Sequence, residues 1–227
     1  MTYRKPPIFK NQIYHVFNRG IAKVPIFFDK RDYFRFFEVT NFYRFSSPEM
    51  RFSYYNRLEY NSKKKFLDNL ESKNEQQVNI YSYCLMPNHF HFVLKEIIEN
   101  GIKNFTGNLQ NSYAKYINTK MKRTGSLFQE MFKAVRIDSD EQLLHTVRYV
   151  HLNPLTSYLV KDFDQLIKYP WSSLNDYITG INSTPFLDTS LIHSFYKSSG
   201  DLLAFTKDQA DFQNKLKEIM HLTLDFV

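Results

Sequence analysis

The sequence predicts an α+β fold in which helices pack on an antiparallel β-sheet. The first observation is a β-hairpin signal at residues 80–95, where two apolar runs flank a Pro-Asn turn. The second is the order of hydrophobic periodicities along the chain, which is strand, helix, strand, strand, helix, strand, helix. Together they indicate a sheet with helices layered on it.

The second strand of the hairpin carries the pattern His89-Phe90-His91-Phe92. Because side chains alternate between the faces of a strand, His89 and His91 share one face and the two phenylalanines share the other. Histidines two residues apart on a strand lie about 7 Å apart at Cα, so both imidazoles can converge on one metal ion. The alternative is a pair of half-buried histidines without a ligand, the more common origin of an isolated His-x-His.

The N-terminal third predicts one strand, one helix and an insertion. Residues 13–18 alternate and predict the first strand. Residues 29–43 have a helical period with an aromatic face, and Asp29 followed by Asp32 suits a helix start. Residues 45–77 are rich in Asn, Ser and Glu and contain a run of three lysines, and we interpret them as a partly helical insertion. Such a run is usually a solvated face, and a DNA contact is the less common alternative.

Downstream of the hairpin, the pattern continues with a helix and a strand. Residues 102–120 predict a helix whose apolar stripe includes two tyrosines, which we interpret as packing residues. Residues 131–137 predict a fourth strand with Lys133 and Arg136 on opposite faces. Near the C-terminus, residues 201–222 have a helical pattern.

The helix predicted at residues 140–153 places an unusual pair of side chains. Its leucines and valines form one apolar stripe, and Tyr149 and Asn153 lie next to each other on the flank away from that stripe. Packing alone would not choose a tyrosine there with an amide one turn later. Pro154 disfavours helical geometry at the preceding residue, so we expect the helix to end at Asn153.

Length, charge and cysteine content narrow the class of protein. The 227 residues suit one domain, or one domain with an extension. A net charge of +7 and a pI near 9.2 favour a polyanionic partner, most simply nucleic acid, with a weakly basic cytosolic protein as the alternative. One cysteine excludes an intramolecular disulfide and a cysteine-rich zinc site. Without a membrane-length apolar run or a hydrophobic signal core, we expect no membrane partner and a cytoplasmic protein, nucleoid-associated when bound to DNA.

Four motifs occur in a fixed order along the chain: YHVFNRG at residues 14–20, MPNHFHFVL at 86–94, GSLFQ at 125–129 and RYVHLNPL at 148–155. In order and spacing they resemble the motifs of single-tyrosine transposases of the HUH endonuclease superfamily, especially the branch associated with repeated extragenic palindromes. The resemblance covers roughly residues 11–178, apart from the insertion. It implies a ferredoxin-like or RRM-like HUH endonuclease fold in a domain of residues 1–178, with an insertion at about 45–77 and a C-terminal helical extension at 179–227.

The resemblance also implies an activity and its residues. It implies a transposase-like endonuclease that nicks and rejoins single-stranded DNA through a covalent 5′-phosphotyrosine, without ATP. Tyr149 matches the nucleophile, and His89 and His91 match the metal-binding pair. Asn153 matches the third polar ligand, which is Gln in some members. The implied cofactor is a divalent metal, Mg²⁺ or Mn²⁺; two histidines favour Mn²⁺ on softness, whereas Mg²⁺ is more abundant in cells.

DNA contacts are expected from basic and amide side chains, for which the candidates are Arg19, Gln129, Lys133, Arg136 and Arg148. Each basic residue, taken alone, is more often an ordinary surface charge, and Gln129 either touches DNA or caps its turn. The expected partner is single-stranded or hairpin DNA of palindromic repeats, whose exposed bases can stack on aromatic side chains. Relatives include dimers and proteins that act alone, so a homodimer stays an open alternative.

Two other functions remain compatible with the sequence. A domesticated module would keep the fold and bind palindromic DNA or structured RNA without turnover, although the intact His-x-His and Tyr-x-x-x-Asn patterns argue against it. A metal-dependent nuclease that activates water would also use His89 and His91 but would tolerate Tyr149→Phe. A covalent protein–DNA adduct distinguishes the transposase chemistry from both.

Overall fold

The computed structural model describes residues 7–208, except residues 47, 130 and 182. Its four strands form one antiparallel sheet in the order β2-β3-β1-β4. The strands are β1 (Ile13–Arg19), β2 (Val78–Met86), β3 (His89–Glu96) and β4 (Lys133–Ile137). With α1 (Lys30–Tyr43) after β1 and α4 (Gly101–Lys120) after β3, the connectivity is the βαββαβ pattern of ferredoxin-like folds. The predicted α+β fold class is confirmed.

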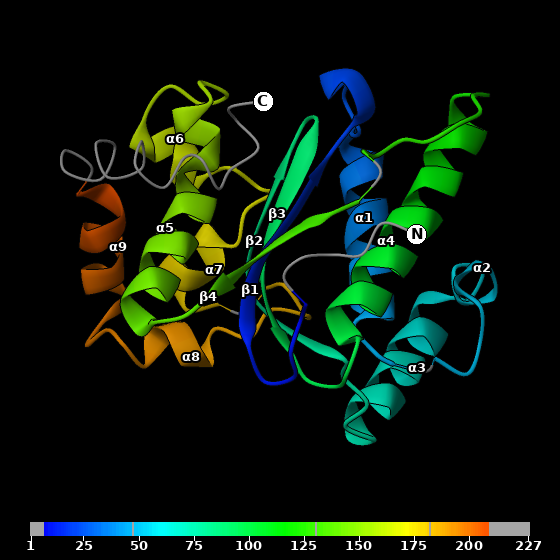
Figure 1. Cartoon of the computed structure of the whole chain (residues 1–227), viewed down its shortest axis with the longest axis horizontal. Helices are drawn as coiled ribbons and strands as arrows, with labels where there is room; N and C mark the ends of the chain where they lie inside the picture. Colours follow the sequence, from blue (N-terminus) through cyan, green and yellow to red (C-terminus); the bar gives the residue numbers. More distant parts are fainter. Residues whose placement is uncertain (1–6, 47, 130, 182, 209–227) are drawn as a thin grey trace.

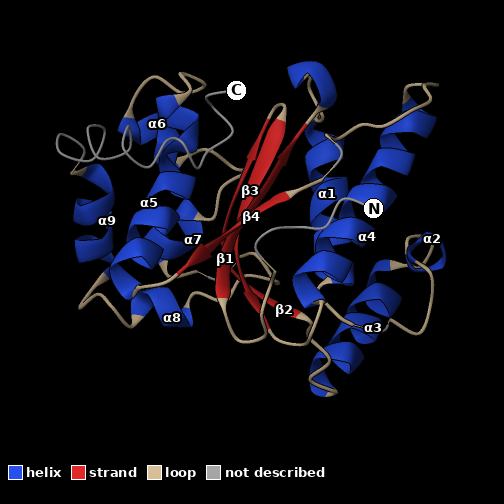
Figure 2. Cartoon of the chain, viewed as in Figure 1, coloured by secondary structure: helices blue, strands red, loops and turns tan. Residues whose placement is uncertain are grey.

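Helices cover both faces of the sheet (Figure 1, Figure 2). On one face α1 packs against α4, and on the other α5 (Asp140–Thr156) packs on the strands and against α9 (Ser199–Lys207). The remaining helical elements are η1 (Ile21–Lys23), α2 (Phe52–Tyr55), α3 (Tyr60–Ser72), α6 (Phe163–Ile167), α7 (Leu174–Thr179) and α8 (Ser190–His193). Among the helices described, none is long and apolar enough to cross a membrane.

The two faces of β3 differ in chemistry, as the alternation of its side chains predicts. Phe90 and Phe92 are buried against Phe36 of α1, with ring centroids 5.4 and 6.2 Å away. The opposite face carries His89 and His91, which are also buried, and His91 lies against α5. The face of β3 beneath α1 and α4 is therefore aromatic, while its face beneath α5 holds titratable side chains.

The outer edge of β2 is covered by chain from the C-terminal region. The N–H of Leu85 donates to the carbonyl of Trp171, and the N–H of Asp188 donates to the carbonyl of Ile80. Covering an unpaired strand edge in this way protects it from pairing with other chains. Leu202 of α9 belongs to the same core cluster as the sheet residues. Of the helix predicted at 201–222, residues 209–222 lie outside the described residues.

The end of α5 differs from the prediction, because the helix continues past Pro154 to Thr156. The prediction that it ends at Asn153 is wrong. A proline removes its own N–H from the helical ladder and crowds the carbonyl four residues earlier, but the residues after it can still form helical hydrogen bonds. The ladder closes again beyond it, since the N–H of Ser157 donates to the carbonyl of Asn153 at 3.0 Å. The hydrogen bonds that remain are therefore enough for α5 to continue past Pro154 to Thr156.

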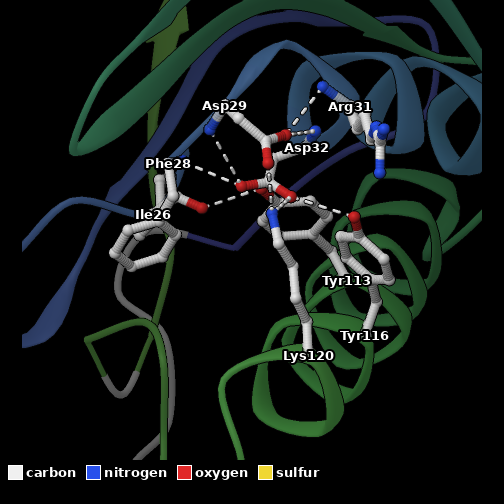
Figure 3. Close-up of polar contacts among 8 residues, drawn as sticks. All are labelled: Ile26, Phe28, Asp29, Arg31, Asp32, Tyr113, Tyr116 and Lys120. Atoms are coloured by element: carbon white, nitrogen blue, oxygen red, sulfur yellow. Dashed lines mark hydrogen bonds and ion pairs between the residues drawn. The ribbon is translucent and has the colours of Figure 1, made fainter.

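A buried carboxylate joins the start of α1 to the end of α4 (Figure 3). Asp29 caps α1 by accepting hydrogen bonds from two backbone N–H groups, in a capping box with Asp32. Asp32 is fully buried and accepts from the N–H of Phe28 at 2.8 Å and from the Tyr116 hydroxyl at 2.9 Å. Lys120 of α4 lies 2.6 Å from Asp32 and 2.9 Å from Asp29. The cluster therefore holds together the helix pair behind the sheet.

Replacing Asp32 by Ala should lower the free energy of unfolding by about 3 kcal/mol, because backbone N–H groups lose their acceptor and Lys120 loses its buried partner. Urea unfolding followed by circular dichroism measures the loss. Glu49→Ala is the matched control, since it removes the surface carboxylate that lies 2.6 Å from Lys73 and should leave the midpoint unchanged. Equal, small effects of the two substitutions would contradict a structural role for the cluster.

Candidate active site

The His-x-His strand and the Tyr-x-x-x-Asn helix meet on the face of the sheet beneath α5. The Tyr149 ring stands edge-on to the ring of His91, with centroids 5.6 Å apart, and edge-on to that of His15 at 5.7 Å. His15 of β1 stacks on His91, and its Nε2 lies 2.9 Å from His91 Nδ1. The ring of His89 lies 5.0 Å from that of His91. Three imidazoles and one phenol therefore form a single cluster.

Tyr149 is more buried than its helical position predicts. Its side chain is 8% exposed, whereas the sequence predicts a flank turned away from the buried stripe. That expectation is wrong because α5 lies between two layers, with the sheet on one side and α9 on the other. Both sides of such a helix are buried, and the side that carries Tyr149 packs against the histidines of the sheet.

An asparagine fixes the orientation of His89. The amide Nδ2 of Asn88 donates to the carbonyl of Lys23 at 3.0 Å, which turns Oδ1 toward His89 Nδ1, 2.6 Å away. Since a carbonyl oxygen only accepts, Nδ1 of His89 carries the ring proton, and in the neutral ring Nε2 holds the lone pair that a metal needs. The turn itself is held in place, since Gly20 N–H donates to the carbonyl of Asn88 at 2.8 Å.

His15 and His91 are neutral over the physiological pH range. Burial lowers the pKa of His15 to about 3. Burial also lowers the pKa of His91 well below its usual value, and positive charge nearby, including that of Arg19, adds to the shift. Their hydrogen bond uses one ring proton. When His91 Nδ1 supplies that proton, His91 Nε2 presents a lone pair.

The histidine pair fits a divalent metal. His91 Nε2 is buried and makes no hydrogen bond to any residue that the structure describes. Buried polar atoms in proteins nearly always have a hydrogen-bond partner, so this nitrogen is free to bind a ligand. Among the residues that the structure describes, no group of three or more His, Cys, Asp or Glu side chains is arranged to hold a metal ion. The candidate donors are thus two imidazoles and an amide, of which the imidazoles favour Mn²⁺ over Mg²⁺ and the amide oxygen suits either ion.

Asn153 lies one turn beyond Tyr149 on α5 and is 2% exposed. Its Nδ2 lies 3.4 Å from the Tyr149 carbonyl, to which it donates, so Oδ1 is the atom that could bind a metal. α5 runs from the end of β4 toward the end of the sheet where the β2–β3 turn lies (Figure 1). Moving from Tyr149 to Asn153 therefore follows the same direction as moving from His91 to His89.

Two of the basic residues predicted to contact DNA lie on the same face of the sheet as the histidine cluster. Arg19 is 6% exposed and pairs across the sheet with His89. Lys133 is exposed and pairs across the sheet with Phe17, whose ring contacts those of the histidines. Because directly opposed residues project to the same face, both side chains point to the α5 side.

The other three predicted DNA contacts lie elsewhere. Arg136 pairs with Tyr14 on the opposite face and forms an ion pair with Asp138 at 2.8 Å. Arg148 is 6% exposed, and its guanidinium donates to the Phe205 carbonyl at 3.0 Å and stacks on the Phe205 ring. These contacts attach α9 to α5. Gln129 lies in a loop beside α4, where its N–H donates to the carbonyl of Arg19.

The histidines that flank Tyr149 on α5 have other partners. His145 lies 3.2 Å from Arg148 and 3.7 Å from Glu141. His151 is fully buried, burial lowers its pKa to about 3, and its Nε2 lies 2.9 Å from the hydroxyl of Ser173. His145 thus contacts residues of its own helix, whereas His151 joins α5 to Ser173, which lies outside the helix.

Sequence reasoning missed His15 and Asn88 as members of the site. The alternation of β1 places His15 on the same face as Arg19, which was a usable signal. Nothing local indicates its partner, because His15 and His91 are 76 residues apart in the chain. The Pro-Asn turn was recognised as a turn, yet the bond from Asn88 to His89 depends on the loop that contacts its amide.

In this structure a ferredoxin-like sheet holds a histidine pair against a tyrosine of the helix that follows its last strand. The family model described as IS200-like transposase matches residues 48–153, just under half of the 227-residue chain, so the chain is similar to that family over this segment. The fold matches a solved REP-associated tyrosine transposase bound to a REP hairpin, with a TM-score of 0.53 and 13% sequence identity over 84% of this chain and 93% of that chain. No curated protein sequence matches the chain.

Proposed function

We propose that this protein is a transposase that nicks and rejoins single-stranded DNA, with Tyr149 as the nucleophile and a divalent metal at the histidine pair. The single observation that carries the proposal is the edge-on contact of the Tyr149 ring with His91, at 5.6 Å between centroids. It places a phenol beside the imidazole whose Nε2 is buried without a hydrogen-bond partner among the described residues.

The reaction is a transesterification, in which one phosphodiester replaces another. The Tyr149 oxygen loses its proton and attacks the scissile phosphorus, while the bond from phosphorus to the 3′-oxygen breaks. The 5′-phosphate is then attached to Tyr149, and the 3′-oxygen leaves as a hydroxyl after taking up a proton. Attack of a 3′-hydroxyl on the phosphotyrosine reverses these changes and rejoins DNA, so no ATP is consumed.

The residues around Tyr149 divide the remaining tasks. A divalent ion held by His89, His91 and Asn153 would polarise the scissile phosphate and offset its negative charge in the transition state. Packing between α5 and the sheet orients the phenol of Tyr149. Arg19 lies across the strand pair from His89, which supports a role for its guanidinium in binding a phosphate oxygen of the DNA strand.

The proposed substrate is a single strand that carries a hairpin. The net charge of +7 supports a polyanionic ligand. The solved relative with the same fold is bound to a REP hairpin. A hairpin would fix the position of the strand, and an unpaired flank would let the scissile phosphate enter a site this deeply buried.

Denaturing gels test the proposal. The protein is incubated with labelled single-stranded oligonucleotides from the DNA that flanks its own gene, with Mn²⁺, Mg²⁺ or EDTA. We expect a slowly migrating covalent adduct that needs the metal. Nicking without an adduct would instead support a nuclease that activates water, and tight binding without nicking would support a module that only binds DNA.

The hydrogen bond between Asn88 and His89 should increase the affinity of the proposed site for a metal ion. We expect Asn88→Ala to weaken Mn²⁺ binding by about 10–100-fold, the usual cost of losing a partner of a metal-ligating histidine. Isothermal titration calorimetry of the purified protein measures this without any DNA. Asn88→Asp keeps an acceptor for His89 Nδ1 and should recover most of the affinity.

Asn108→Ala on the exposed face of α4 is the matched control for Asn88→Ala and should bind the ion as the wild type does. If Asn88→Ala also binds Mn²⁺ with unchanged affinity, the hydrogen bond to His89 has no bearing on the metal. Unchanged melting temperatures of all variants would exclude a general loss of fold as the cause of weaker binding.

A further inference from the structure

A polar groove lies between the second half of α4 and the loop of residues 123–129, and its volume is about 570 Å³. We call it the α4 groove. Its polar lining residues include Gln110, Asn111, Lys115, Asn118, Arg123 and Gln129. It lies outside the cluster of histidines and Tyr149, and the proposed reaction makes no use of it.

The lining of the α4 groove has the chemistry of a nucleotide site. The described residues that line it include two cations, Lys115 and Arg123, and no carboxylate. Four of the lining side chains are amides. An amide offers a donor and an acceptor side by side, the pattern that matches base edges, while lysine and arginine suit phosphate oxygens.

The walls of the groove are held in place before any ligand arrives. Asn118 of α4 donates from Nδ2 to the carbonyl of Gly125 at 2.8 Å, and Arg123 donates to the carbonyl of Ser126 at 2.9 Å. Gly125 adopts a φ of +90°, a conformation that favours glycine and turns the loop back toward α4. Gln110 Nε2 is buried in the wall without a hydrogen-bond partner within the described residues, so the wall keeps an unused donor.

The loop that forms one wall of the groove continues to the candidate active site. The N–H of Gln129 donates to the carbonyl of Arg19 at 2.9 Å, and Asn18 Nδ2 donates to the carbonyl of Gln129 at 3.2 Å. Arg19 in turn pairs across the sheet with His89. The loop that lines the α4 groove is therefore hydrogen-bonded to the end of β1, at the residue that lies opposite His89 in the sheet.

We propose that the α4 groove binds unpaired nucleotides of the same DNA strand whose phosphodiester lies at the histidine pair. In this arrangement Lys115 and Arg123 contact the phosphates, and the amides of Gln110 and Asn111 read a base edge. The inference rests on the proposed function, since it takes single-stranded DNA as the ligand. It adds a second contact region that positions the strand and selects its sequence near the scissile bond.

Binding of single-stranded DNA tests the groove apart from cleavage. Fluorescence anisotropy in EDTA measures the dissociation constant of the full-length protein for a labelled oligonucleotide over a range of salt concentrations. We expect Lys115→Gln to weaken binding several-fold and to lower the slope of log affinity against log salt by about 0.7, the value for one phosphate contact on a single strand. Asn111→Ala should reduce the preference among bases at one position by about tenfold.

Lys64→Gln is the matched control, because Lys64 is an exposed lysine of α3, remote in the chain from the groove. It should bind as the wild type does. If the groove variants also bind with unchanged affinity, salt slope and base preference while the wild type binds DNA and forms the covalent adduct, the groove proposal is overturned and the proposed function stands. If the groove variants lose affinity but no adduct ever forms, the groove stands and the nicking function fails.

Discussion

Tyr149→Phe should abolish the covalent protein–DNA adduct and lower the rate of nicking by about a thousandfold or more, as expected when a catalytic nucleophile is removed. The substitution deletes one oxygen and keeps the ring, which packs edge-on against His15 and His91. Stability should therefore change little. The measurement is the yield of adduct and of nicked strand on denaturing gels, with oligonucleotide binding recorded in parallel.

Tyr158→Phe is the matched control, since the Tyr158 side chain follows the end of α5 and is 93% exposed. It should nick DNA as the wild type does. Nicking that survives in Tyr149→Phe would rule out Tyr149 as the nucleophile. It would support a nuclease in which a water molecule attacks the phosphodiester. Loss of binding in Tyr149→Phe would point instead to a structural role of the phenol.

His91→Gln should lower the nicking rate by about 10²–10³-fold, the range found for removing one preorganised electrostatic contact in a transition state. Wild-type protein in EDTA should show a comparable loss. The reason is that the buried Nε2 of His91 is one of the proposed donors to the ion, and glutamine cannot replace both nitrogens of the ring. Calorimetric titration with Mn²⁺ should show the loss of affinity independently of DNA.

A buried histidine also contributes to packing, so the readouts need to separate the two roles. His193→Gln changes a histidine of α8 that contacts the ring of Tyr177, and it should leave metal binding intact. If His91→Gln lowers the melting temperature but titrates Mn²⁺ as the wild type does, His91 is only a core residue. Metal-dependent nicking at full rate in this variant would contradict the proposed site.

Much of the fold follows from local patterns in the sequence. Alternation along β3 predicted that Phe90 and Phe92 share one face and His89 and His91 the other, and the structure has this arrangement. Asp29 was predicted to start a helix, and it caps α1 through its side chain. Such features depend on periods of two and 3.6 residues and on backbone N–H groups that need an acceptor, so short windows contain them.

The sequence by itself therefore determined the antiparallel sheet with its helices, the histidine face and the motifs of a transposase family. Only the tertiary structure decided what surrounds them. It buried Tyr149 between two layers, paired His15 with His91 across 76 residues, and turned Arg148 toward α9. It also let α5 run past Pro154. The physical reason is that periodicity is local, whereas burial and hydrogen-bond partners depend on which distant segments pack together.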